Sequence, residues 1–454
     1  MNNSYPSPLS NNQPGDWLLL DGQATPDQPV KNEEQFQGNL LPAIFVGIYF
    51  LSIFPLPFWP IQNLRWYFAL GLALFAFLAQ KESINPRAAK IFWVMAGLNF
   101  CGALLSLIRT TNFDLALWNT VGLGISLFTF LLFLPILATH LGRKILFIVL
   151  IGSSVLWAFE IQRMLVTFGR LSFSSYKLVE WNKNNVGSLL SFAAGALFYL
   201  ALFWSPSGNA RKWPATTEFM VRVGFGVAGF YLLYCILAIY DRSSVLILLV
   251  GLAGLLLLFL YRSSKKWLRL FQILIIISVV VVIIVLFLPK FLLILPDWNR
   301  LSYFNSQGLR VINTYEIRRV LIMKAIFLIS ENPWLGVGIG GTRAAVSSTN
   351  SDYPYFYIHN VYLTEWAEKG ILAILSYIIM LATYLKFLWL KFFKVSIVDQ
   401  VWLLIIALVF ISGYFDDSNT TLILILTLFA GIYYDQYQKD QSKMTSALDQ
   451  SEGV

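Results

Sequence analysis

Long apolar stretches separated by short polar segments run through most of this chain. A stretch of about 20 apolar residues predicts a helix that crosses a bilayer, because a helix pairs its backbone polar groups internally. The pattern predicts about 12 transmembrane helices of this kind. They fall at about residues 40–59, 64–80, 89–108, 115–138, 144–166, 186–204, 219–240, 243–261, 268–288, 370–390, 400–415 and 419–435. The expected fold class is an all-α integral membrane protein.

The composition supports this class. Hydrophobic residues make up 57% of the 454 residues and charged residues 13%, whereas a soluble domain carries about 25% charge. A soluble enzyme, a disordered protein and a nucleic-acid-binding protein are excluded by these figures. The 33 Lys and Arg residues exceed the 24 Asp and Glu residues, and in an apolar chain this excess indicates positive loops beside a membrane.

The distribution of Lys and Arg predicts the orientation of the helices. The short loops on one side hold most of these residues, which by the positive-inside rule places that side and both termini in the cytoplasm. Residues 1–39 are polar and rich in Asn, Pro and Gln, so they are expected to form a disordered cytoplasmic tail rather than a signal peptide. Residues 40–435 form the expected membrane domain, and residues 436–454 form a second cytoplasmic tail.

Two connections on the predicted outer face, at about residues 167–185 and 289–369, are longer than helix packing needs. The second lies between predicted helices 9 and 10 and is not of low complexity. Among its charged and imidazole side chains, the candidates for chemistry are Arg300, Arg310, Arg318, Arg319, Arg343, His359, Glu365 and Glu368. A long Arg-rich connection on one face is where we expect chemistry to occur.

The segment Tyr315–Glu331 is predicted to be a helix that ends at Asn332-Pro333. At about 100° per residue, Arg319 and Lys324 share one broad face, and Arg318 points nearly opposite. The shared face fits a solvated surface. Arg318 would lie on the apolar side, where a charge is costly without a partner, and a bound anion would supply one.

The segment Gly336–Gly341 fits the pattern GxGxxG. The dinucleotide-binding interpretation requires a preceding strand, but a helix and Asn332-Pro333 precede this segment. A tight backbone loop is favoured instead, and its N–H groups are candidates for binding an anion.

His359 is the one histidine on the predicted outer face; His140 lies on the cytoplasmic side. Asn360 and a short predicted helix, Val361–Lys369, follow it directly. A lone histidine is often structural, but an imidazole with a pKa near 6.5 can take a proton from a hydroxyl group at neutral pH. His359 is therefore the candidate general base.

Arg242 follows Asp241 at a very short outer turn. It is either a local partner of Asp241 or an Arg placed where a lipid phosphate would lie. Asp416-Asp417 is interpreted as a solvated turn, because no third metal ligand follows at a useful spacing. No metal site and no cofactor are expected, and Cys101 and Cys235 are interpreted as small buried side chains.

These motifs, in this order, resemble the O-antigen ligase and polymerase family over about residues 180–390. The matching stretches are Asn182–Gly187, Tyr240–Ser244, Arg318 through Asn332-Pro333-Trp334-Leu335-Gly336-Val337-Gly338, and His359-Asn360 with Gly370. Two positions depart from the family pattern: Asp241 replaces the usual Ser, and Ala373 replaces Gly, Thr or Tyr. Both departures weaken the assignment to ligases in particular.

The resemblance implies an inverting, metal-independent membrane glycosyltransferase of cell-surface polysaccharide or lipopolysaccharide biosynthesis. Its donor would be a glycan on undecaprenyl diphosphate, and its acceptor a glycan or lipid, at the outer face of a bacterial inner membrane. Arg242 and Arg319 would bind the diphosphate, with Arg318 as the alternative to Arg319. His359 would deprotonate the acceptor hydroxyl, and Asn360 would belong to the same binding site.

Two other functions stay open at this point. A polymerase would join lipid-linked repeats with the same base and the same diphosphate contacts, and a separate chain-length regulator could act on it. The family also includes proteins described as inorganic-carbon transporters. The absence of a clear internal repeat in the sequence disfavours transport.

Overall fold

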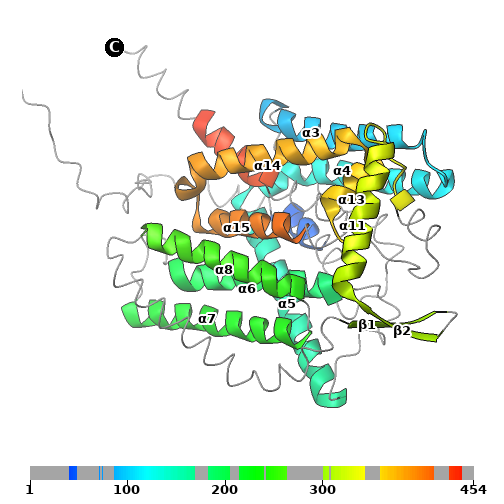
Figure 1. Ribbon diagram of the computed structural model, residues 1–454. Coiled ribbons are helices and arrows are strands. Elements are labelled where there is room, and N and C mark those ends of the chain that lie inside the picture. The colour runs from blue at the N-terminus through cyan, green and yellow to red at the C-terminus, as the bar shows by residue number, and fades with distance from the viewer. Residues whose placement is uncertain are drawn as a thin grey trace, which may run out of the picture.

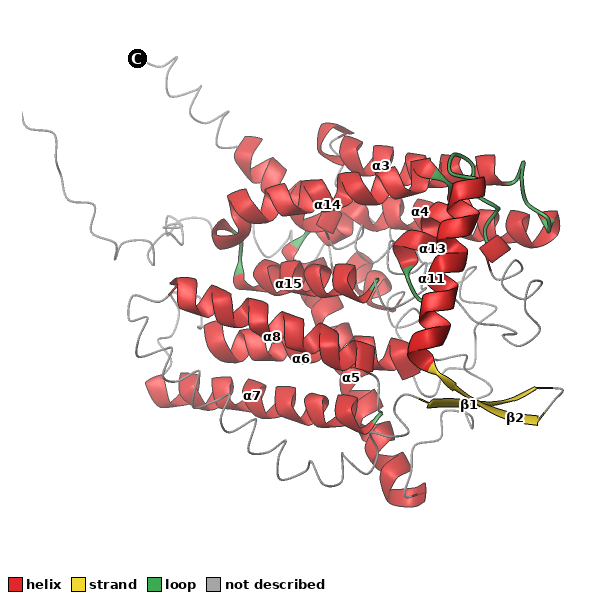
Figure 2. Cartoon of the chain, in the orientation of Figure 1, coloured by secondary structure: helices red, strands yellow, loops and turns green. Residues whose placement is uncertain are grey.

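The computed structural model describes residues 40–48, 71, 74, 86–168, 183–204, 214–239, 242–262, 300–305, 308–342, 358–413 and 429–441. These residues are helical apart from loops and one two-stranded hairpin, as Figure 2 shows. The long helices are α3 (Pro86–Ser106), α4 (Phe113–Ala138), α5 (His140–Phe168), α6 (Lys183–Phe203), α7 (Ala215–Ala238), α8 (Arg242–Arg262), α14 (Ile371–Lys391) and α15 (Ile397–Ser412). Between α8 and α14 lie β1 (Arg300–Asn305), β2 (Gly308–Asn313), α11 (Thr314–Glu331) and α13 (Val361–Lys369).

Within the described ranges, 6 helices are long and apolar enough to cross a membrane. They are Ala89–Ser106, Phe113–Ala138, His140–Thr167, Val186–Phe203, Ala215–Ala238 and Ile371–Lys394. The shorter apolar helices Ser243–Leu256 and Ile397–Ser412 coincide with two further predicted stretches. The prediction of a helical membrane protein is therefore confirmed. The predicted helix at 268–288 lies outside the described residues, as does 64–80 except for residues 71 and 74.

Large apolar side chains cover much of the outside of these helices. Trp118 on α4 is 71% exposed and Trp389 on α14 is 90% exposed. In water such surfaces would drive association, whereas in a bilayer they face acyl chains of similar polarity. The exposed apolar surface is therefore what a lipid-facing bundle requires.

The helices α3, α14, α15, α8, α6 and α7 lie side by side, and α11 crosses one end of this bundle next to α13 (Figure 1). At this end the amide of Val361 donates to the carbonyl oxygen of Gly413, just after α15, over 2.8 Å. The α3–α4 turn reaches the same place, because a Cβ built on Gly338 would lie 2.5 Å from the Cβ of Thr110. We call this the α13 end.

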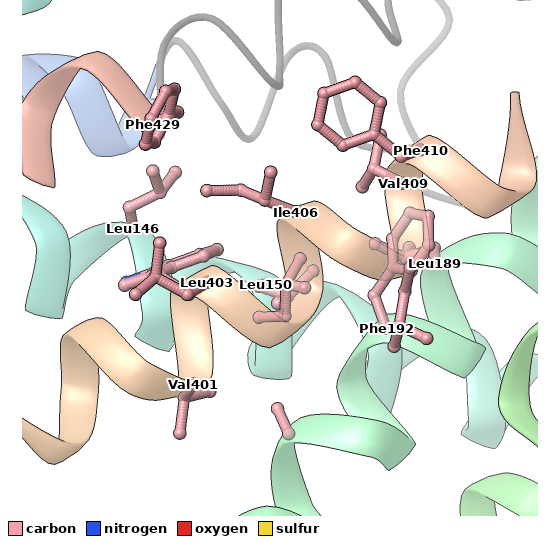
Figure 3. Close-up of a cluster of buried hydrophobic side chains, with 14 of the residues drawn as sticks. Leu146, Leu150, Leu189, Phe192, Val401, Leu403, Ile406, Val409, Phe410 and Phe429 are labelled. Carbon is pink, nitrogen blue, oxygen red and sulfur yellow. The ribbon is translucent and has the colours of Figure 1, made fainter. Parts of the chain in front are cut away.

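The centre of the bundle is formed by α15, which is buried between α5 and α6. Figure 3 shows Leu403 and Ile406 of α15 beside Leu146 and Leu150 of α5, with Leu189 of α6 close to Val409. Small residues allow α15 to approach its neighbours closely. On α8, for example, a Cβ on Gly251 would lie 2.7 Å from the side chain of Leu408 of α15. Close packing of this kind holds membrane helices together where lipid removes the hydrophobic driving force.

A buried charge cluster lies at the opposite end of the bundle. The Nε of Arg143 is 2.6 Å from an oxygen of Asp399, and the two side chains are 2% and 1% exposed. Arg143 also contacts Asp435 at 2.9 Å and donates to the carbonyl oxygens of Leu137 and Ala138, at the end of α4. The cluster ties α4, α5, α15 and the helical segment 429–441 together, and it satisfies carbonyls that a helix end leaves free.

The long connection before α14 contains more regular structure than the sequence predicted. β1 and β2 pair antiparallel, with Arg300 opposite Asn313 and Asn305 opposite Gly308, and they lead directly into α11. The predicted helix 315–331 is confirmed by α11, and the predicted helix 361–369 by α13. The parts of this connection at 289–299 and 343–357, the tail 1–39 and the pair Asp416-Asp417 lie outside the described residues.

Candidate functional site

The site is built around the short helix α13 and the two residues that precede it. Asn360 is the N-cap of this helix, and its side-chain oxygen accepts a hydrogen bond from the amide of Leu363 over 3.0 Å. An Asn at this position satisfies one of the amides that the first helical turn leaves free. Asn360 is buried, so in this structure it shapes the backbone beside His359.

His359 adopts an unusual backbone conformation directly before this cap. Among the described residues it is the only non-glycine residue with a positive φ, at 52°. The left-handed region costs an L-residue about 1–2 kcal/mol, and such strain persists where the surroundings impose it, often at active sites. The imidazole is half-buried, and its Nδ1 is shielded from solvent. The surroundings therefore hold the backbone of His359 in a conformation that it would rarely adopt alone.

Two hydrogen bonds connect the start of α13 to the end of α15. Besides the Val361–Gly413 bond, the hydroxyl of Tyr362 donates to the carbonyl oxygen of Phe410 over 2.5 Å. Burial raises the pKa of Tyr362 to about 12, so this hydroxyl keeps its proton at neutral pH and remains a donor. The ring of Tyr362 also packs edge-on against Tyr377 of α14, with centroids 5.5 Å apart.

The glycine-rich loop after α11 lies against the other end of α13. Gly336, Gly338 and Gly340 have φ values of 71°, 91° and 83°, which glycine adopts without a Cβ penalty. The amides of Val337 and Gly338 donate to the carbonyl oxygens of Ala367 and Glu368, each over 2.9 Å. These amides are used inside the protein, so the expectation that they bind an external anion is wrong for both.

The loop does hold one side-chain group of α13, the carboxyl of Glu368. The hydroxyl of Thr342 donates to this carboxyl, and so does the backbone amide of Gly340. Glu368 is 4% exposed, and burial raises the pKa of its carboxyl, opposed by these hydrogen bonds and by the charge of Lys369. The loop thus binds a side chain of this chain instead of a nucleotide.

The segment Asn332–Gly336 fits closely onto the junction of α13 and α14. A Cβ on Gly370 would lie 2.1 Å from the carbonyl oxygen of Trp334, and Gly370 has a φ of 73°. The indole N–H of Trp366 donates to the carbonyl oxygen of Pro333 over 3.1 Å. The structure therefore brings together two motifs that the sequence separates, the Asn-Pro-Trp-Leu-Gly segment and the His-Asn segment with Gly370.

The helix α11 packs on α13 with one face, and Arg318 and Arg319 lie outside this face. Its buried side chains Leu328 and Ile329 contact Ala367. Arg318 is half-buried, as is Lys324, and Arg319 is exposed. Arg319 lines a surface hollow together with Val320, Met323, Lys324 and Phe327. Arg319 is thus open to a ligand.

Arg242 is the first residue of α8, at the turn where α7 ends and α8 begins. This turn is joined to the start of α6, because the hydroxyl of Ser191 lies 2.9 Å from the carbonyl oxygens of both Gly187 and Ser244. The described parts of the two motifs at Asn182–Gly187 and Tyr240–Ser244 are therefore neighbours. Asp241 and the side chain of Arg242 lie outside the described residues.

Sequence reasoning missed a buried polar network around α13. Asn99 of α3, Glu365 and Lys369 are each at most 1% exposed and bond to one another. The available signals were an Asn within an apolar stretch and a Glu–Lys pair at i,i+4 spacing. In the described part of the chain, no group of three His, Cys, Asp or Glu side chains is placed to hold a metal ion.

Residues 227–378 match a family model described as O-antigen ligase. The matched segment runs from the second half of α7 into α14, and it includes Arg242, Arg318, Arg319, His359 and Asn360. No curated protein matches the chain. Together with the apolar helices, the match indicates a multi-pass membrane protein of glycan processing. The match at residues 227–378 thus confirms the resemblance to the O-antigen ligase family that was drawn from the sequence motifs.

Proposed function

We propose that this protein transfers a glycan from undecaprenyl diphosphate to an acceptor hydroxyl at the outer face of a bacterial inner membrane. The single observation that carries the proposal is the strained backbone of His359, with φ at 52°, inside an O-antigen ligase domain. A strained backbone of this kind is frequent at active sites. A general base does need a fixed position relative to the proton it removes.

In the proposed reaction the acceptor oxygen attacks the anomeric carbon of the donor sugar. His359 takes the hydroxyl proton, and the bond between that carbon and the diphosphate oxygen breaks. The diphosphate leaves with the electron pair, so one displacement inverts the anomeric configuration. Because the leaving group departs as an anion, this reaction needs charge stabilisation more than a second proton donor, and it needs no metal ion.

Arginine side chains would supply that charge stabilisation. We assign Arg242 and Arg319 to the diphosphate, with Arg318 as the alternative to Arg319. Arg–phosphate hydrogen bonds contribute roughly 1.5–3 kcal/mol each, and contacts that strengthen as the diphosphate departs accelerate the reaction. The exposure of Arg319 supports this role, since an anion can reach it without displacing a packed side chain.

The membrane arrangement proposed with this function has about 12 transmembrane helices and both termini in the cytoplasm. Residues 40–435 would form the membrane domain, with 289–369 as its large extracytoplasmic connection. The positions of His359, Gly338 and Gly413 at one end of the bundle, and of Arg143 at the other, support this arrangement.

Purified protein, an undecaprenyl-diphosphate-linked glycan and candidate acceptors test the proposal. Wild-type protein should form a glycosylated acceptor, and His359→Ala should form it about 10²–10⁴-fold more slowly while inserting normally. Equal transfer by His359→Ala would overturn the base assignment. A product that lengthens on the lipid carrier would identify a polymerase instead, and uptake of bicarbonate into vesicles without transfer would identify a transporter.

A further inference from the structure

A network of buried polar side chains lies where α3, α13 and α14 meet. The Nζ of Lys369 is 2.7 Å and 2.9 Å from the two oxygens of Glu365. Asn99 of α3 completes it: its side-chain N–H donates to Glu365 over 2.9 Å, and its oxygen accepts from Lys369 over 3.2 Å. Ser376 of α14 accepts a second, longer bond of 3.4 Å from Asn99.

This network is costly to bury. Glu365 and Lys369 are each 1% exposed, and Asn99 is fully buried. A buried ion pair repays its desolvation poorly, and apolar side chains of similar volume often give equal or greater stability. Ionisable residues enclosed within a membrane bundle are more often functional than stabilising. Stability alone therefore explains the network poorly.

The geometry of α13 gives the network a second role. The helix has only nine residues, and its first turn begins directly after His359. Glu365 and Lys369 lie one turn apart on it, so Asn99 fixes both its rotation and its distance from α3. Close backbone contact strengthens this constraint, because a Cβ on Gly102 of α3 would lie 2.8 Å from the carbonyl oxygen of Lys369. A rotation of α13 would move His359.

We infer that Asn99, Glu365 and Lys369 are positioning residues that act through α13 to hold the His359 imidazole in its reactive orientation. The inference rests on the proposed role of His359 as the base. It goes beyond that role by assigning residues that touch neither substrate nor reacting atoms. The directional pairing of a carboxylate, an ammonium group and one amide suits this task, since apolar contacts would allow α13 to rotate.

The histidine content of the chain allows a direct test that needs no substrate. The protein has 2 histidines, His359 at the α13 end and His140 at the start of α5, beside Arg143 of the opposite cluster. With ¹³C,¹⁵N-labelled histidine in nanodiscs, the two imidazoles are assigned by a His140→Gln variant. In the Glu365→Leu, Lys369→Met double variant, the His359 resonance should shift or split, while that of His140 stays unchanged.

A matched control exists on α7. Glu218 and Arg222 form an ion pair at the same i,i+4 spacing, but it is partly exposed. The Glu218→Leu, Arg222→Met double variant should leave the His359 resonance unchanged. The charge-swapped variant, Glu365→Lys with Lys369→Glu, should restore much of the wild-type His359 signal, because the amide of Asn99 can turn over and serve the reversed pair.

Activity supplies the second readout. The Glu365→Leu, Lys369→Met variant should lose about tenfold or more in kcat with little change in KM for the lipid-linked glycan. In a His359→Ala background the same double variant should cause no further loss, since its effect passes through His359. An unchanged His359 resonance, or an equal loss of kcat in both backgrounds, would overturn the inference. A different outcome would overturn only the assignment of His359 as the base. In that outcome His359→Ala keeps full activity, while the Glu365→Leu, Lys369→Met variant still shifts the His359 resonance.

Discussion

The backbone amide of Gly338 donates a hydrogen bond of 2.9 Å to the carbonyl oxygen of Glu368. This bond joins the glycine loop after α11 to the last turn of α13, so the glycines of this loop serve the position of a helix rather than the binding of a nucleotide. The consequences of this arrangement can be measured at several positions.

Gly336 and Gly370 should not tolerate a side chain. Both have positive φ, and a Cβ on Gly336 would lie 2.4 Å from the carbonyl oxygen of Glu368. Gly336→Ala and Gly370→Ala should therefore displace the loop from α13 and lower the thermal midpoint of the detergent-solubilised protein. Gly97→Ala is the control, since apart from its chain neighbours and the backbone of its own helix no atom lies within 4 Å of its Cβ position. Equal midpoints for all three variants would contradict the close packing.

The Glu368 carboxyl should make stability depend on pH. Burial raises its pKa above the ordinary value of 4.5, so the folded protein keeps a proton that the unfolded chain has lost. The contribution of Glu368 to the free energy of unfolding is fully present below pH 4.5. It is lost as the pH rises through the pKa that this carboxyl has in the folded protein. Glu368→Gln should match the wild type at low pH and exceed its thermal midpoint increasingly as pH rises. A constant difference between the two proteins across this range would refute the prediction.

His359→Asn should separate the backbone role of this residue from its chemistry. Asn tolerates the left-handed region well, so the thermal midpoint should stay near that of the wild type. Glycan transfer should fall about 10²–10⁴-fold, which is the usual contribution of a general base. The measurement is product formation by the purified variant. A variant that retains both stability and transfer would show that the imidazole is not the base.

Arg319→Ala should weaken donor use without harming the fold, because the side chain is exposed. Loss of one Arg–phosphate contact costs roughly 1.5–3 kcal/mol, or about tenfold to a hundredfold in kcat/KM. Lys324→Ala, in the same surface hollow, serves as the control for a general loss of positive charge. If Arg319→Ala and Arg242→Ala both behave as the wild type, the diphosphate binds elsewhere, and Arg318→Ala becomes the next variant to measure.

Arg143→Met should destabilise the opposite end of the bundle. It would leave Asp399, 1% exposed, without its cation, and breaking a buried pair costs about 3–5 kcal/mol. Lys439→Met provides the comparison, because Lys439 pairs with Asp435 at 3.0 Å but is 58% exposed, and such pairs contribute about 1 kcal/mol or less. The thermal midpoints of the two variants should therefore differ clearly, with Arg143→Met the lower.

Much of the fold follows from short stretches of sequence. The apolar stretches predicted the positions of α3 to α8, α14 and α15, because a bilayer requires each backbone group to be paired within its own helix. The bounds of α13 follow from Asn360 as its cap and Gly370 as its end, and those of α11 from Asn332-Pro333. Helical periodicity also predicted an exposed Arg319, which the structure has, but Lys324, predicted on the same face, is half-buried like Arg318.

Other features depend on which segments become neighbours. The pairing of Asn99 with Glu365 and Lys369, and that of Gly338 with Glu368, joins residues from separate elements, and no local pattern states which helices will be adjacent. The strain at His359 likewise arises because α15 and the glycine loop hold both ends of α13. Helix periodicity and capping are local and can be read from the sequence; buried polar pairing and backbone strain are decided by packing, which only the tertiary structure contains.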